Sequence, residues 1–162
     1  RGIGLEPLEP PVTAAVLVKA LSGSTAPLKA VLLDQTRIAG LGNIYVCEAL
    51  HRSGLSPFRS AASIVAPDAA SRTRAARLSK AIRQVLVEAI DAGGSTLRDF
   101  SGADGKPGYF QHSFRVYDRE GAGVPAADVT DDHALRSGRT LYVSLPRMSD
   151  MMAPGSRRLF GE

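Results

Sequence analysis

The amino-acid sequence predicts a mainly α-helical protein that ends in a small β-hairpin. Apolar residues recur at helical spacing over residues 12–93, and glycines and prolines separate these segments. Beyond residue 113 the pattern changes to the two-residue alternation of strands. Hydrophobic residues form 44% of the 162-residue chain and charged residues 22%, which is the balance of a folded protein.

The first part of the chain is expected to form four helices after a non-helical lead-in. Prolines exclude a helix from residues 1–11, which are interpreted as an interdomain linker. Residues 58–67 are interpreted as a loop, and Gly93-Gly94 as the end of the last helix. The third helix opens at Asn43 or Ile44. The four expected helices cover residues 12–21, 27–36, 43–51 and 67–92.

The second part is expected to hold a loop, a hairpin and a tail. Residues 98–108 are rich in turn formers and predict an exposed loop. Phe114–Tyr117 and Arg139–Leu145 alternate like two strands. The predicted organisation is a helical domain over residues 12–113, a hairpin over 114–148 and an irregular tail over 149–162.

Composition excludes several classes of protein. No apolar run approaches the ~18 residues that cross a bilayer, and the N-terminus lacks the apolar core of a signal peptide. Because Cys47 is the only cysteine, disulfide frameworks and four-cysteine zinc sites are excluded. We therefore expect a cytoplasmic protein without metal or cofactor. The net charge of +4 indicates a polyanionic partner only if basic residues share one surface.

The most informative segment runs from Leu28 to Tyr45. It predicts a helix, a double turn with Gly40 and Gly42, and a second helix that opens with Asn43. A helix N-terminus exposes N–H groups and the positive end of the helix dipole, so it can bind a phosphate. Asn43 can add a donor to such a site, or it can simply cap its own helix.

Residues 28–45 closely resemble the helix–two-turn–helix of the formamidopyrimidine-DNA glycosylase and endonuclease VIII-like family. The resemblance covers about residues 4–142. It is closest to the formamidopyrimidine branch, because residues 104–110 closely match that branch's Asp-Gly-Lys-Pro-Gly-Tyr-Phe loop. The other segments that are similar to family motifs, in the same order, are residues 5–8, 92–100, 104–111 and 116–121.

This resemblance implies the DNA-binding half of a bifunctional DNA glycosylase and AP lyase that repairs oxidised purines. The implied partners are double-stranded DNA with damaged bases or abasic sites, and the N-terminal catalytic domain of the same parent protein; a monomer is expected. The alternative is a stand-alone helix–two-turn–helix module that binds nucleic acid without enzymatic activity. The motifs around residues 92–111 favour the glycosylase, because a generic module needs no lesion-sensing loop.

The resemblance also implies roles for individual residues. Asn43 and Tyr117 would each bind a phosphate, while Arg139 would reach into the DNA at the lesion. The implied DNA-binding residues are Lys29, Gly42, Asn43, Tyr117 and Arg139. Without the family, Lys29 would be interpreted as a solvated helix lysine, Tyr117 as a packed strand aromatic and Arg139 as an exposed strand end.

The loop over residues 98–108 would close over the extruded base and offset the few kcal/mol that unstacking costs. Its implied base-recognition residues are Arg98, Asp99, Phe100, Ser101, Gly105 and Lys106. No catalytic residue is expected in this chain, because the family's nucleophile is an N-terminal proline followed by glutamate on a domain that precedes the linker. Whether this chain alone is an enzyme is therefore left open.

The hairpin departs from the family pattern, because the cysteines of its zinc finger are replaced. Val124 and Ala127 stand at the first cysteine pair. Ser144 stands at the second pair with Arg147, or with Met148 if one residue is inserted. The resemblance therefore implies a zincless finger over residues 114–148. Asp118 replaces a usual glycine and adds a negative charge beside Tyr117.

The purified protein is expected to contain no stoichiometric zinc, because a structural site needs four ligands and the four cysteines are absent. Elemental analysis checks the content directly. A chelator should leave the melting temperature unchanged, and a drop in that temperature would contradict the prediction.

Overall fold

The computed structural model describes residue 4, residues 6–7 and residues 10–93. Within them the chain forms helices only, apart from an isolated bridge between Pro27 and Ser60. The helices are α1 (Ala14–Leu21), α2 (Leu28–Leu32), α3 (Asn43–Ser53), α4 (Ala62–Val65) and α5 (Ala69–Asp91). The mainly helical fold class is thus confirmed, whereas the predicted hairpin lies outside the described residues. No helix among the described residues is both long and apolar enough to span a membrane.

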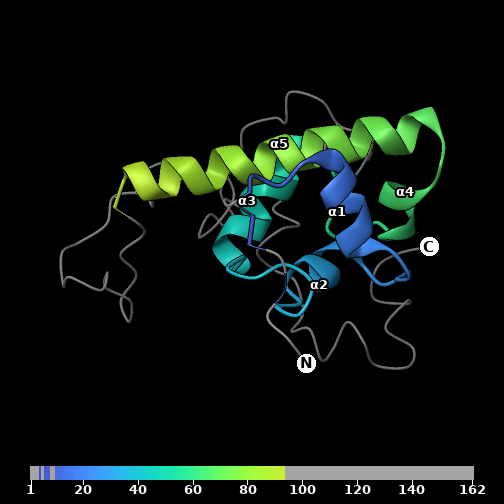
Figure 1. Ribbon diagram of the computed structural model, residues 1–162, viewed down its shortest axis with the longest axis horizontal. Coiled ribbons are helices and arrows are strands. Elements are labelled where there is room, and N and C mark those ends of the chain that lie inside the picture. Colours follow the sequence, from blue (N-terminus) through green and yellow to red (C-terminus); the bar gives the residue numbers. More distant parts are fainter. Residues whose placement is uncertain (1–3, 5, 8–9, 94–162) are drawn as a thin grey trace, which may run out of the picture.

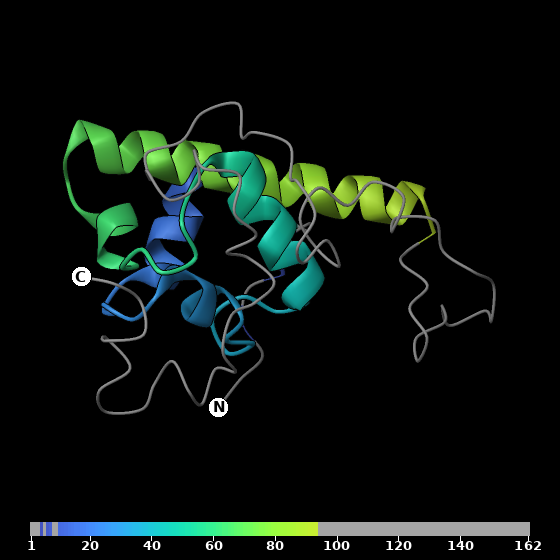
Figure 2. The same ribbon diagram turned by 180° about the vertical axis from the view of Figure 1, so that it is seen from behind.

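The long helix α5 lies along one side of the fold, and the other helices pack beneath it (Figure 1). Its most extensive contact is with α3, and α1 and α4 also pack against it. Seen from behind, α2 again lies on the side away from α5, next to the start of α3 (Figure 2). This arrangement encloses one core between α5 and α2.

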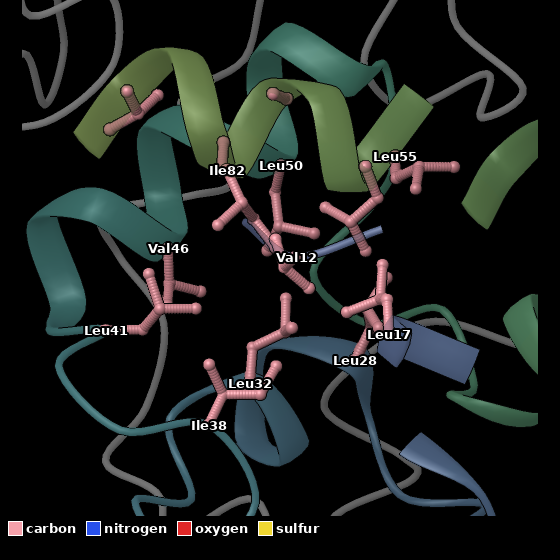
Figure 3. Packing of buried hydrophobic residues seen from close by; sticks show 14 of the residues in the cluster. Val12, Leu17, Leu28, Leu32, Ile38, Leu41, Val46, Leu50, Leu55 and Ile82 are labelled. Carbon is pink, nitrogen blue, oxygen red and sulfur yellow. The ribbon is translucent and has the colours of Figure 1, made fainter. Parts of the chain in front are cut away.

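The core is built of aliphatic side chains from every helix and from the loops between them. Figure 3 shows Leu17 of α1, Leu32 of α2, Leu50 of α3 and Ile82 of α5 pointing toward one another. None of these four residues is more than 1% exposed. Because close-packed aliphatic groups tolerate little displacement, this contact fixes the positions of α2 and α3 relative to α5.

Helix α5 begins and ends close to its predicted limits. The Asp68 carboxylate accepts hydrogen bonds from the Ser71 backbone N–H (2.8 Å) and hydroxyl (2.9 Å). These donors lower the pKa of Asp68 because they favour its charged form. Gly93 follows the last turn with a φ of 75°, the left-handed conformation expected of a C-terminal glycine.

Three helix predictions were inaccurate. Helix α2 ends at Leu32, not at residue 36, because the Asp34 carboxylate accepts hydrogen bonds from the Thr36 N–H (2.9 Å) and hydroxyl (2.6 Å) and forms a turn. The predicted loop over residues 58–67 contains α4. This helix has only four residues, which is too short to show a helical period. Helix α3 runs two residues past the predicted end, to Ser53.

Part of the lead-in packs against the connection between α2 and α3. The Gly4 N–H donates to the Gln35 carbonyl (3.0 Å). A Cβ atom at Gly4 would lie 2.6 Å from the Arg37 carbonyl carbon and 2.7 Å from the Gln35 oxygen. Only glycine allows this approach without a backbone shift, so residue 4 is specifically fitted to this connection.

Replacing Leu50 by Ala should lower the free energy of unfolding by about 2–5 kcal/mol, because it opens a cavity between α3 and α5. Denaturant titration measures the change. Val87→Ala on α5 is the matched control, because Val87 is 48% exposed. This variant should lower the free energy of unfolding far less. Equal losses for the two variants would contradict the assignment of Leu50 to the core.

Candidate nucleic-acid interface

The connection between α2 and α3 consists of two successive turns. In the first, the Asp34 carbonyl accepts hydrogen bonds from the N–H groups of Arg37 (2.9 Å) and Ile38 (3.1 Å). In the second, Gly40 adopts a φ of 81°, which is readily available only to glycine. The structure therefore confirms the glycine-bearing double turn predicted between the two helices.

One side chain, Gln35, links the end of α2 to the second turn through three hydrogen bonds. Its Nε2 donates to the carbonyls of Leu33 (3.2 Å) and Leu41 (2.9 Å). Its Oε1 accepts from the Gly40 N–H (2.9 Å). Sequence reasoning missed this residue; the available signal was an amide side chain five residues before the first glycine of the double turn.

Arg37 attaches the same connection to α1. Its Nη1 donates to the carbonyls of Ala20 (2.9 Å) and Ser22 (3.1 Å), at the C-terminal end of α1. The negative end of the α1 dipole favours this placement of a guanidinium. Arg37 also forms an ion pair with Asp34 (3.6 Å). The turns are thus attached to the C-terminal end of α1.

The turns place the N-terminus of α3 at the surface, without a side-chain cap. Gly42 is the N-cap of α3, with extended backbone (φ −87°, ψ 175°), and no side chain caps the helix. Gly42 and Asn43 are both exposed, and the space where a Gly42 Cβ would stand is open. Asn43 is the first helical residue, so the interpretation that Asn43 caps its own helix is wrong.

Beneath this surface lies a small buried polar group formed by Lys29 and Cys47. The Cys47 Sγ lies 3.6 Å from the Asn43 Oδ1, and it shares a side-chain hydrogen bond with Lys29. Burial raises the pKa of the Cys47 thiol and lowers the pKa of Lys29. Lys29 is only 5% exposed, so its interpretation as a solvated helix lysine is wrong.

The structure thus brings three of the predicted DNA-binding residues to one place: Lys29, Gly42 and Asn43. Tyr117 and Arg139 lie outside the described residues. The same holds for the six predicted base-recognition residues, Arg98, Asp99, Phe100, Ser101, Gly105 and Lys106.

Gln35→Ala should loosen the second turn, because it removes three hydrogen bonds that each contribute about 0.5–1.5 kcal/mol. We expect a lower melting temperature and faster hydrogen exchange at the Gly40 N–H. The control is Gln84→Ala on the exposed face of α5. Unchanged exchange at Gly40 would show that the backbone alone holds the turn.

Comparison with known proteins identifies the family. Residues 3–101 match the model of the formamidopyrimidine-DNA glycosylase H2TH domain. The formamidopyrimidine-DNA glycosylase of Beijerinckia indica is 58% identical over 144 residues, which is 88% of this chain and 50% of that protein. The chain therefore spans about half the length of this curated relative.

Solved structures agree with this match. The crystal structure of the MutM (Fpg) protein from Thermus thermophilus superposes with a TM-score of 0.68 at 45% identity, over 79% of this chain and 47% of that one. The complex of Lactococcus lactis Fpg with an abasic site containing DNA gives 0.61 at 33% identity, over 75% and 42%. The chain, with its double turn between α2 and α3, belongs to the formamidopyrimidine-DNA glycosylase H2TH-domain family.

Proposed function

We propose that this chain is the DNA-binding part of a base-excision-repair DNA glycosylase and AP lyase that acts on oxidised purines. The observation that carries the proposal is the exposed, uncapped N-terminus of α3 at Gly42 and Asn43. It lies in a chain whose relatives are formamidopyrimidine-DNA glycosylases, one of them solved with abasic DNA. A stand-alone binding module is not favoured, because the likeness to these glycosylases extends over 88% of the chain.

The uncapped end of α3 suits a DNA phosphate for two reasons. The first N–H groups of a helix have no partner within the helix, and the helix dipole places partial positive charge there. Gly42 lets the DNA backbone approach without a side chain in between. The Asn43 amide adds a donor at the same exposed end. Contacts of this kind position the protein on the duplex but carry no sequence information.

Selectivity for damage is therefore assigned to other parts of the protein. Tyr117 would bind a second phosphate and Arg139 would enter the DNA at the lesion. The loop over residues 98–108 would hold the extruded base. The nucleophile would come from an N-terminal catalytic domain of the same monomeric, cytoplasmic parent. The domain limits 12–113 and 114–148 belong to this proposal.

Asn43→Ala should weaken binding of intact and abasic duplexes by the same factor, about 10- to 100-fold, since a hydrogen bond to a charged group contributes about 1.5–3 kcal/mol. The slope of log affinity against log salt should hardly change, because the amide is neutral and displaces few counterions. Fluorescence anisotropy over a salt series measures both quantities.

The control for this titration is Gln84→Ala, on the exposed face of α5. It should bind both duplexes like the parent chain. A loss confined to the abasic duplex would place Asn43 at the lesion instead of at a flanking phosphate. No loss on either duplex would remove the end of α3 from the DNA-binding surface and overturn the proposed function.

A further inference from the structure

The buried thiol of Cys47 lies directly under the residue assigned to the phosphate. Cys47 follows Asn43 by four residues, so the two side chains share one face of α3. The Sγ lies 3.6 Å from the Asn43 Oδ1, while Cys47 itself is 0% exposed. Asn43 is exposed, so this contact joins the inner side of its amide to the interior of the protein.

The hydrogen bonds around the sulfur have a defined direction. The single thiol proton of Cys47 is donated to the Asn43 Oδ1. The sulfur therefore accepts in its hydrogen bond with Lys29, whose Nζ carries N–H donors. The thiol keeps its single proton at neutral pH, because burial raises the pKa of Cys47. That proton is then available for the Asn43 Oδ1. The chain of donors runs from Lys29 through Cys47 to Asn43.

This direction matters for the other end of the amide. Oxygen and nitrogen lie on opposite sides of the Asn43 Cγ, so holding the oxygen inward turns the two N–H donors of Nδ2 outward. An anionic phosphate accepts hydrogen bonds and donates none. An asparagine free to rotate would present its oxygen to the phosphate part of the time, and oxygen repels that anion.

We propose that Cys47 is a positioning residue for DNA binding: held by Lys29, its thiol orients the Asn43 amide so that its N–H donors face the phosphate. The inference rests on the proposed function, since it assigns a partner to Asn43. It also gives Lys29 a role without requiring that this buried side chain reach the DNA. Cys47 contacts no phosphate itself and acts only through Asn43.

The test is a double-mutant cycle on the full chain with a duplex that carries a stable abasic-site analogue. Cys47→Ala should weaken binding about three- to tenfold, which corresponds to one neutral hydrogen bond of about 0.5–1.5 kcal/mol. Cys47→Ser should restore binding, because a hydroxyl also accepts from Lys29 and donates to Asn43. In the Asn43→Ala background, Cys47→Ala should have no further effect.

Three results would overturn the proposal: equal losses from Cys47→Ala in both backgrounds, no loss in the parent background, or no rescue by Cys47→Ser at unchanged melting temperature. An Asn43→Ala variant that binds like the parent would overturn the proposed function as well. A normal Asn43 effect without coupling to Cys47 would overturn only the positioning role. The two failures are therefore distinguishable.

A second measurement does not depend on the Ala variant's folding. Cys47→Val fills the same space with an apolar side chain of similar size but removes the donor. NMR relaxation of the Asn43 side-chain amide in free protein should show an ordered Nδ2 group in the parent and in Cys47→Ser. The same group should be more mobile in Cys47→Val. Equal order in all three proteins would show that the thiol does not orient the amide.

Discussion

The packing of α3 against α5 is the contact on which the proposed DNA-binding surface depends. From Val46 to Leu50 every residue of α3 is buried, and its most extensive neighbour is α5. The first residue, Asn43, is exposed. A helix is a rigid rod over this length, so burying its middle fixes the direction in which its N–H groups point. The core therefore sets the direction in which the proposed phosphate-binding end of α3 faces.

The turns that precede α3 further restrict where its first residues lie. Gln35 contacts three backbone groups of its own connection, and Arg37 contacts two carbonyls at the end of α1. Each neutral bond contributes about 1 kcal/mol to stability, which is small beside the aliphatic core. Their larger effect is to restrict the path of the chain between α2 and α3. Gly40 makes this path possible through its positive φ.

The sequence predicted those parts of the fold that depend on residues close together in the chain. The limits of α5 follow from Asp68 and the glycine at its end, and both act within one turn. Helix α2 was predicted too long, because apolar spacing continues while the Asp34 side chain already competes for the backbone. The contact between Lys29 and Cys47 was not predictable, since it joins two helices whose relative position depends on the whole core. Burial of polar side chains is a tertiary property.

The caps of the three longest described helices show how stability and binding are separated in this chain. Thr13 caps α1 and Asp68 caps α5 with side-chain oxygens, whereas α3 begins at Gly42 without such a cap. Glycine at an N-cap costs only a few tenths of a kcal/mol relative to a serine or aspartate. An aspartate there would place a negative charge at the end of α3 and repel a phosphate, whereas Gly42 has no side chain. The helix that faces the proposed ligand thus gives up a small amount of stability, and a bound phosphate would interact with its first N–H groups in place of a side-chain cap.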